Sequence, residues 1–188
     1  MRVIAGEAKR LKLVAPKGDT TRPTSDKIKE TLFNILAPDI YGVTFLDLFA
    51  GSGAIGIEAL SRGASGCTFI EKNKDAVNCI KTNLQTTRFT DRARIYPNDV
   101  GTCLHTLHPA KPYGIIFMDP PYGKDMERSV LTMLAGSDII DDDTLIIVEE
   151  ADDADLSYIE DLGFYMIRVK HYKNSKHVFI RRSVREVI

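Results

Sequence analysis

Short apolar runs alternate with amphipathic stretches from residue 43 onward, and this alternation limits the possible folds more than any other feature of the chain. The runs predict strands at residues 43–48, 67–71, 93–96, 115–118 and 144–149. The stretches between them carry apolar residues at helical spacing, such as Val77, Ile80 and Leu84. Strands that alternate with helices in this way form a parallel sheet with helices on both faces. We therefore predict an α/β fold.

The C-terminal part adds two further strand-like runs, at residues 164–170 and 176–182. They flank Lys173-Asn174-Ser175, which is a turn signal, so we expect them to form a hairpin at one edge of the sheet. A hairpin joins antiparallel strands. The sequence thus predicts a seven-stranded, mostly parallel sheet with an antiparallel C-terminal strand.

The beginning of the chain precedes this pattern and is predicted to form a small extension. Two short apolar runs, at residues 2–5 and 11–15, are separated by a polar stretch and predict a β-hairpin. A helix is predicted from about residue 24, and a proline at position 38 ends it. We therefore expect a hairpin-and-helix extension over residues 1–40 and a main domain over residues 41–188.

Composition limits the class of protein. The chain has 188 residues, 44% hydrophobic and 27% charged, which suits one folded domain with a small appendage. No apolar stretch approaches the roughly 20 residues of a membrane span, and the first residues soon turn polar, so we expect neither a span nor a secretory leader. The three cysteines, Cys67, Cys79 and Cys103, are widely spaced and odd in number, which favours reduced thiols in a cytoplasmic protein.

Charge is unevenly distributed behind a formal net charge of −1. Residues 1–30 carry eight Lys or Arg against four acids, and residues 165–188 carry seven against one. Such segments suit a polyanion, since each neutralised phosphate releases counterions, although an ordinary solvated surface explains either run alone. His171 and His177 flank the C-terminal turn and are expected to add only weak basicity. Residues 138–161 hold eleven acids and no Lys or Arg, and we expect them to form a solvated face turned away from RNA.

A glycine-rich segment follows the first predicted strand, where ligands bind in open α/β sheets. Gly51 and Gly53 allow backbone torsions and a close ligand approach that a Cβ would forbid. Together with Gly56 they satisfy the dinucleotide pattern G-x-G-x-x-G, and Glu71 follows at the spacing typical of a ribose-binding acid. This pattern alone makes an NAD-dependent oxidoreductase a serious alternative.

Acidic residues at the ends of three successive predicted strands favour a different nucleoside cofactor. Asp47 precedes the glycines, where a carboxylate would oppose a pyrophosphate and favour a cation. Glu71 can accept hydrogen bonds from both ribose hydroxyls, and Asp99 can accept one from an adenine amine. A positively charged nucleoside without phosphate, such as S-adenosylmethionine (SAM), suits this combination. Each acid taken alone is equally well explained as a helix N-cap or a surface carboxylate.

The segment Asp119-Pro120-Pro121-Tyr122 follows the fourth predicted strand, which adjoins the first in a doubly wound sheet. The two prolines stiffen the turn and remove two backbone donors. Asp119 and the Pro120 carbonyl can each accept one N–H of an exocyclic amine, and Tyr122 can stack on a planar base, which is worth about 1–3 kcal/mol. The segment therefore predicts a pocket for a base that carries an amino group.

These motifs together resemble a known family. Asp-Pro-Pro-Tyr after an apolar strand, downstream of Asp-x-Phe-x-Gly-x-Gly, is similar to the signature of SAM-dependent methyltransferases that act on exocyclic amino nitrogens. Three further segments narrow the resemblance to the RsmD family: Arg2-Val3-Ile4-Ala5-Gly6, Arg22-Pro23-Thr24 and Glu30-Thr31-Leu32-Phe33-Asn34. The resemblance implies a Rossmann-like class I SAM-dependent methyltransferase fold. It also implies methylation of N2 of one guanine in 16S ribosomal RNA. We expect the substrate to be the small subunit or its assembly intermediate, and the enzyme to be a monomer that uses no metal.

The resemblance also implies roles for individual residues. The residues that would bind SAM are Asp47, Phe49, Gly51, Gly53, Glu71 and Asp99. The residues that would form the catalytic site and hold the target base are Asp119, Pro120, Pro121 and Tyr122. In the basic extension, the candidates for RNA binding are Arg2, Arg10 and Arg22. Because the target atom lies on the Watson–Crick edge, the base has to be unpaired or flipped out.

Several alternatives remain open from the residues themselves. An NAD-dependent oxidoreductase explains the glycines and Glu71 but leaves Asp47 and Asp119 without a role. A non-catalytic RNA-binding module explains only the basic ends. Among methyltransferases, enzymes acting on adenine N6 and on protein glutamine N5 are rivals, and the motif alone does not separate guanine N2 from adenine N6.

Overall fold

The computed structural model describes residues 1–16, 25–121 and 125–183. The strands are β1 (Thr44–Leu48), β2 (Gly66–Ile70), β3 (Ala93–Tyr96), β4 (Ile115–Met118), β5 (Leu145–Ala151), β6 (Phe164–His171) and β7 (Ser175–Arg182). They form one sheet in the order β3-β2-β1-β4-β5-β7-β6. Only β7 is antiparallel to its neighbours β5 and β6, and the other neighbouring strands are parallel. The predicted seven-stranded sheet with an antiparallel C-terminal strand is confirmed.

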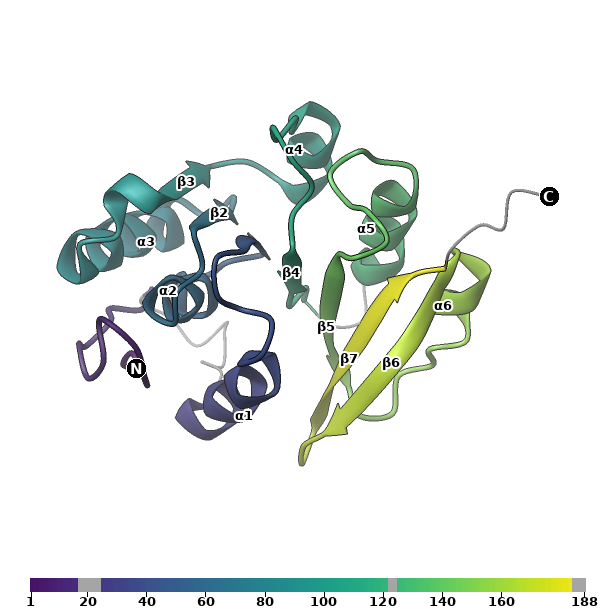
Figure 1. The fold of residues 1–188 in the computed structure, drawn as a ribbon, viewed down its shortest axis with the longest axis horizontal. Helices are drawn as coiled ribbons and strands as arrows, with labels where there is room; N and C mark the ends of the chain where they lie inside the picture. The colour runs from purple at the N-terminus through teal and green to yellow at the C-terminus, as the bar shows by residue number, and fades with distance from the viewer. Residues whose placement is uncertain (17–24, 122–124, 184–188) are drawn as a thin grey trace.

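Helices cover both faces of this sheet (Figure 1). They are α1 (Asp26–Leu36), α2 (Ala54–Ser61), α3 (Lys74–Thr87), α4 (Val100–Thr106), α5 (Met126–Ala135) and α6 (Tyr158–Asp161), with a short 3-10 helix, η1 (Thr90–Arg92). The first three helices pack on one face around Phe33, Phe45 and Phe117. The last three pack on the other face with Leu46 and Met118. Because both faces are covered, the central strands β1, β4 and β5 are buried along almost their whole length, which is why their apolar runs show little alternation.

The N-terminal segment pairs with itself but does not form regular strands. The amide of Val3 donates to the carbonyl of Leu11, and the amide of Arg10 donates back to Val3. A single antiparallel bridge joins Arg2 to Lys12. The predicted hairpin is therefore present only as a short pairing. The reason is that the amides of its turn donate to α2 instead of to a partner strand, as the amide of Glu7 does to the carbonyl of Ser61.

Two expectations about the C-terminal half are wrong. The acidic stretch 138–161 is not uniformly solvated, because Glu149 and Glu150 lie in β5 and are buried. His177 does not add basicity to the surface, because it is fully buried in β7 directly opposite Glu149. Both errors have one cause: the sheet brings β5 and β7 together, and their charged residues are neighbours only in space. Within the described ranges, no helix is long and apolar enough to cross a membrane.

Candidate active site

The glycine loop connects the end of β1 to the start of α2 in a conformation that depends on glycine. Gly51 and Gly53 have φ angles of 55° and 75°, in the left-handed region that favours glycine. Phe49 also lies there, at φ 60°, which costs a non-glycine residue about 1–3 kcal/mol. A Cβ on Gly56 would approach Phe69 within 2.4 Å, so this glycine lets α2 pack closely on the sheet. A Cβ on Gly51 would point into open space, so this part of the loop is accessible to a ligand.

Two carboxylates hold the glycine loop in place. Asp47 is buried at the end of β1, and its Oδ2 accepts a hydrogen bond from the amide of Gly56 at 2.9 Å. Burial raises the pKa of Asp47 well above its usual range, and the hydrogen bond from Gly56 opposes that shift. Glu71 follows β2 and accepts from the amides of Gly51 and Asn73, each at 2.8 Å. Both predicted cofactor-binding acids therefore lie at the loop, where they also order its backbone.

Asp99, the third acid of the predicted cofactor site, is the N-cap of α4. Its Oδ1 accepts from the amide of Thr102 at 2.9 Å, and its Oδ2 accepts from the Thr102 hydroxyl. These bonds lower the pKa of Asp99. A carboxylate can accept about four hydrogen bonds. A contact of Asp99 with adenine, which stays a prediction, would use its remaining lone pairs.

The second motif begins directly after β4, next to the glycine loop in the sheet. β1 and β4 are parallel neighbours, and Leu48 pairs with Met118, so Asp119 follows β4 where Phe49 follows β1. Burial, and then the charge of Glu149, raise the pKa of Asp119 to about 7. Asp119 in turn contributes to the raised pKa of Asp47. The structure thus brings Asp47, Asp119 and Glu149 into one electrostatic group. Tyr122 lies outside the described residues.

Glu149 belongs to a hydrogen-bonded chain that sequence reasoning missed. Its Oε2 lies 3.1 Å from Nε2 of His177, and Nδ1 of His177 lies 3.1 Å from the Tyr172 hydroxyl. The His177 ring also packs edge-on against Phe117 of β4. Glu149 could have been found in the same way as Asp47 and Asp119, because it also follows an apolar run near the carboxyl end of a strand. His177 carried no comparable signal, because its partners are distant in the sequence.

Comparisons with known proteins agree with this geometry. A family model described as "Conserved hypothetical protein 95" matches residues 1–181. The chain is 40% identical over 157 residues to the Bacillus subtilis protein "Putative rRNA methyltransferase YlbH", covering 83% of this chain and 85% of that one. It is 38% identical over 149 residues to the Escherichia coli "Ribosomal RNA small subunit methyltransferase D", covering 79% and 74%. This chain belongs to the RsmD family.

The RsmD-family fold extends over nearly the whole chain. A solved structure described as "Putative methyltransferase yhhF from Escherichia coli" superposes with a TM-score of 0.83 at 32% identity, covering 97% of this chain and 98% of that one. The class I methyltransferase fold expected from the sequence is thereby confirmed.

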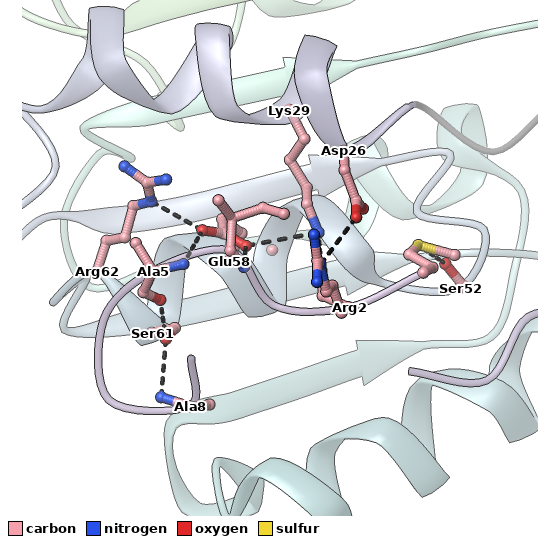
Figure 2. A network of polar contacts seen from close by, with 12 residues as sticks. Arg2, Ala5, Ala8, Asp26, Lys29, Ser52, Glu58, Ser61 and Arg62 are labelled. Atoms are coloured by element: carbon pink, nitrogen blue, oxygen red, sulfur yellow. Dashed lines mark hydrogen bonds and ion pairs between the residues drawn. The ribbon is translucent and has the colours of Figure 1, made fainter. Parts of the chain in front are cut away.

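In this RsmD-family chain the N-terminal segment is fixed to α2 by a buried carboxylate, as Figure 2 shows. Glu58 accepts from the amides of Ile4 and Ala5 at 2.8 and 3.0 Å. Its carboxylate also pairs with Arg62 at 2.8 Å and with buried Lys29 at 3.5 Å. Burial lowers the pKa of Lys29, and the charge of Glu58 opposes that shift. Glu58 thus joins the segment, α1 and α2.

Asn83 of α3 makes a second connection, between the N-terminal segment and the glycine loop. Its Oδ1 accepts from the amide of Val14 at 2.8 Å, and its Nδ2 donates to the carbonyls of Val14 and Ser52, each at 2.9 Å. The sequence did not reveal the connecting role of Glu58 and Asn83, because the backbone groups that they bind in the N-terminal segment are more than fifty positions away.

The candidate RNA-binding arginines are only partly described. Arg2 is exposed, and its Nε lies 3.1 Å from Asp26. Arg10 is exposed in the turn of the N-terminal segment, at a φ of 74°. Arg22 lies outside the described residues. The predicted RNA contacts therefore stay a prediction.

Proposed function

We propose that this protein is a SAM-dependent methyltransferase that modifies the exocyclic N2 of a guanine in the RNA of the small ribosomal subunit. The observation that carries the proposal is the position of Asp119, a half-buried residue that lies between the glycine-loop acid Asp47 and the β5 acid Glu149 in the strand order. The names of the relatives support rRNA as the substrate. We infer that the enzyme works as a monomer in the cytoplasm, on the subunit or its assembly intermediate.

The residues of the glycine loop fit the proposed cofactor. Left-handed Gly51 faces open space, so a ligand can approach its backbone. We propose that Asp47, Phe49, Gly51 and Gly53 hold the methionine part, that Glu71 binds the ribose and that Asp99 lies beside the adenine. The acids suit a ligand with positive charge and no phosphate. When bound, SAM supplies an electrophilic methyl group on its sulfonium.

Asp119 and Pro120 orient and activate the target amine in this proposal. The lone pair of guanine N2 is delocalised into the ring, so the amine is a weak nucleophile. Hydrogen bonds from its two N–H groups to the Asp119 carboxylate and the Pro120 carbonyl favour a pyramidal nitrogen, with the lone pair directed at the methyl group. Asp119 also stabilises the positive charge that develops on nitrogen and can then hold the released proton. Tyr122 is proposed to stack on the base.

Methyl transfer to small subunits tests the proposal. Subunits from cells that lack the protein are incubated with it and with SAM that carries an isotopically labelled methyl group, and the RNA is digested to nucleosides for mass spectrometry. We expect labelled N2-methylguanosine. Labelled N6-methyladenosine would place the enzyme among adenine methyltransferases, and absence of label would contradict the proposal. Calorimetry with SAM and NADH separates the oxidoreductase alternative, because we expect binding of SAM only.

A further inference from the structure

The carboxyl groups at the end of β4 and β5 lie side by side on one face of the sheet. Met118 pairs with Val148 in the parallel register, so Asp119 and Glu149 each follow this pair by one residue. Glu149 pairs directly with His177 across β5 and β7. The register therefore arranges Asp119, Glu149 and His177 in one row, while Asp47 lies two residues earlier, opposite Phe117 of β4. Glu149 lies on the side of Asp119 that faces away from the glycine loop.

Glu149 is held in this row as a hydrogen-bond acceptor. The side chain of His177 is fully buried and that of Glu149 is 9% exposed, so their contact at 3.1 Å is shielded from water. A carboxylate oxygen accepts hydrogen bonds, so we assign Nε2 of His177 as the donor to Glu149 and, for a neutral imidazole, Nδ1 as the acceptor from the Tyr172 hydroxyl. Tyr172 and His177 thus fix both the position of the carboxylate and its role as an acceptor.

The carboxyl groups of Asp119 and Glu149 are two neighbouring hydrogen-bond acceptors, and they suit a ligand that has two neighbouring donors. The charge of Glu149 contributes to the raised pKa of Asp119, and after burial it also raises the pKa of Tyr172, to about 12. A base that donates hydrogen bonds to these two carboxyl groups would lower the repulsion between them. Among the bases with an exocyclic amine, only guanine has a ring N–H next to that amine. Adenine and cytosine have a ring nitrogen with a lone pair at this position, which a carboxylate would repel.

We infer that Glu149 is a specificity-determining residue that accepts a hydrogen bond from N1–H of the target guanine, while Asp119 accepts one from N2–H. His177 acts as a positioning residue, because it orients Glu149 and does not reach the base itself. This inference rests on the proposed function and deepens it, since it gives a structural reason for guanine N2 over adenine N6. That choice was left open by the Asp-Pro-Pro-Tyr motif.

Replacing the target guanine by 2-aminopurine tests this inference. The analogue keeps the N2 amine, lacks O6 and has a lone pair at N1 in place of the N–H. Small subunits that carry either base at the modified position are compared as substrates, and the ratio of their kcat/KM values is measured. We expect the wild-type protein to prefer guanine by about 100-fold, because a site built for a donor rejects an analogue without it.

The Glu149→Gln variant isolates the contribution of the carboxylate. Its amide can accept from guanine or donate to 2-aminopurine, so we expect the preference for guanine to fall to about tenfold or less. Glu150→Gln is the matched control, because Glu150 is the next residue of β5, is also buried, and bonds to Tyr158 instead. We expect this control to keep the wild-type ratio. A wild-type ratio in Glu149→Gln would overturn the inference, whatever its rate on guanine.

Variants of His177 test the positioning role. His177→Gln keeps an N–H donor for Glu149, and we expect it to keep most of the preference for guanine. His177→Leu removes the donor, and we expect its preference to approach that of Glu149→Gln while SAM affinity stays within about twofold. Equal ratios in both variants and the wild type would overturn the role of His177.

A measurement without substrate separates this inference from the proposed function. Because Glu149 raises the pKa of Asp119, carbon-detected NMR of the free protein should show that pKa fall in Glu149→Gln and stay unchanged in Glu150→Gln. An unchanged pKa in Glu149→Gln would contradict the electrostatic influence of Glu149 on Asp119 even if methylation proceeds. Transfer to neither base by the wild-type protein would overturn the proposed function, and the inference with it.

Discussion

The two halves of the site use their carboxylates differently. At the ends of β1 and β2, Asp47 and Glu71 accept hydrogen bonds from the amides of the glycine loop and the segment after β2. At the ends of β4 and β5, Asp119 and Glu149 are close enough that the charge of one shifts the pKa of the other. In the first half, the acidic groups order the backbone of the glycine loop. The second half keeps two acidic groups together at a cost in stability, which is typical of groups held for chemistry.

The largest expected effect comes from removing Asp119. We expect Asp119→Ala to lower turnover by about 100- to 1,000-fold, because the amine loses an acceptor that stabilises its developing charge. SAM affinity should stay within about twofold, since the cofactor half is intact. Single-turnover methylation and calorimetry measure the two effects. Asp142→Ala, an exposed acid in the turn before β5, serves as the control. Full turnover in Asp119→Ala would show that the carboxyl group that follows β4 is not needed for catalysis.

Variants of Gly56 and Gly51 separate the structural role of the glycine loop from its role in binding SAM. We expect Gly56→Ala to destabilise the protein by about 1–3 kcal/mol, because its Cβ would overlap Phe69 at the close contact between α2 and the sheet. In Gly51→Ala the new Cβ meets no protein atom within 4 Å, so only the left-handed backbone is strained. We expect this variant to lose about 1 kcal/mol of stability but to bind SAM more weakly. Denaturant unfolding and calorimetry distinguish the two, and equal effects on both would be inconsistent with the account.

Protonation of Asp119 should control the rate near neutral pH. Its pKa is about 7, and the ionised carboxylate is the stronger acceptor, so we expect kcat to rise about tenfold from pH 6 to pH 8. The corresponding profile of Asp119→Asn should be flat at a much lower rate. Single-turnover rates across this range provide the check, and a flat wild-type profile would argue against an ionised Asp119 in the reacting complex.

The raised pKa of Asp119 also predicts that its ionised form destabilises the folded protein. The pKa of Asp119 is higher in the folded protein than its ordinary value of 3.8, so this group favours folding at low pH, and that contribution is lost as the pH rises toward about 7. Asp119→Asn should therefore raise the melting temperature at pH 8 and leave it nearly unchanged at pH 4. Thermal unfolding at the two pH values measures this. A lower melting temperature at pH 8 would show that the carboxylate is stabilised in the fold.

The smallest effect is expected at the surface. We expect Arg2→Ala and Arg10→Ala each to weaken RNA binding several-fold and to reduce the slope of log K against log salt by about one, without changing SAM affinity. Lys111→Ala is the control. This exposed lysine precedes β4 and therefore lies near the amino-terminal ends of the strands, whereas the candidate site lies at their carboxyl-terminal ends. An equal loss in the control would indicate binding through net charge alone and not through the N-terminal segment.

The fold was largely predictable from the sequence because its strands are buried on both faces. Runs such as residues 115–118 are apolar throughout, and each expected strand matches an observed one within about two residues. The hairpin of the extension was less predictable. Its apolar runs were recognised, but the amides of Ile4 and Ala5 bond to Glu58, a residue more than fifty positions away. Local pattern does not reveal a partner of that kind.

The site was predictable where its residues follow one another along the chain. The glycine loop and Asp119 could be located because each lies at the end of an apolar run. Glu149 also follows an apolar run and was open to the same argument, but the acidic composition of residues 138–161 made it look like an exposed acid. His177 could not be located, since it meets Glu149 only when β7 inserts between β5 and β6.

Nucleoside analysis of ribosomal RNA shows whether Asp119 is needed to methylate N2 of a guanine in the cell. Cells that lack this protein are complemented with the wild-type gene or with Asp119→Ala, and the digested small-subunit RNA is analysed by mass spectrometry. We expect N2-methylguanosine to decrease by one site per small subunit in the deletion, to return with the wild type and to stay absent with Asp119→Ala. Unchanged N2-methylguanosine in the deletion, or its return with Asp119→Ala, would contradict the account.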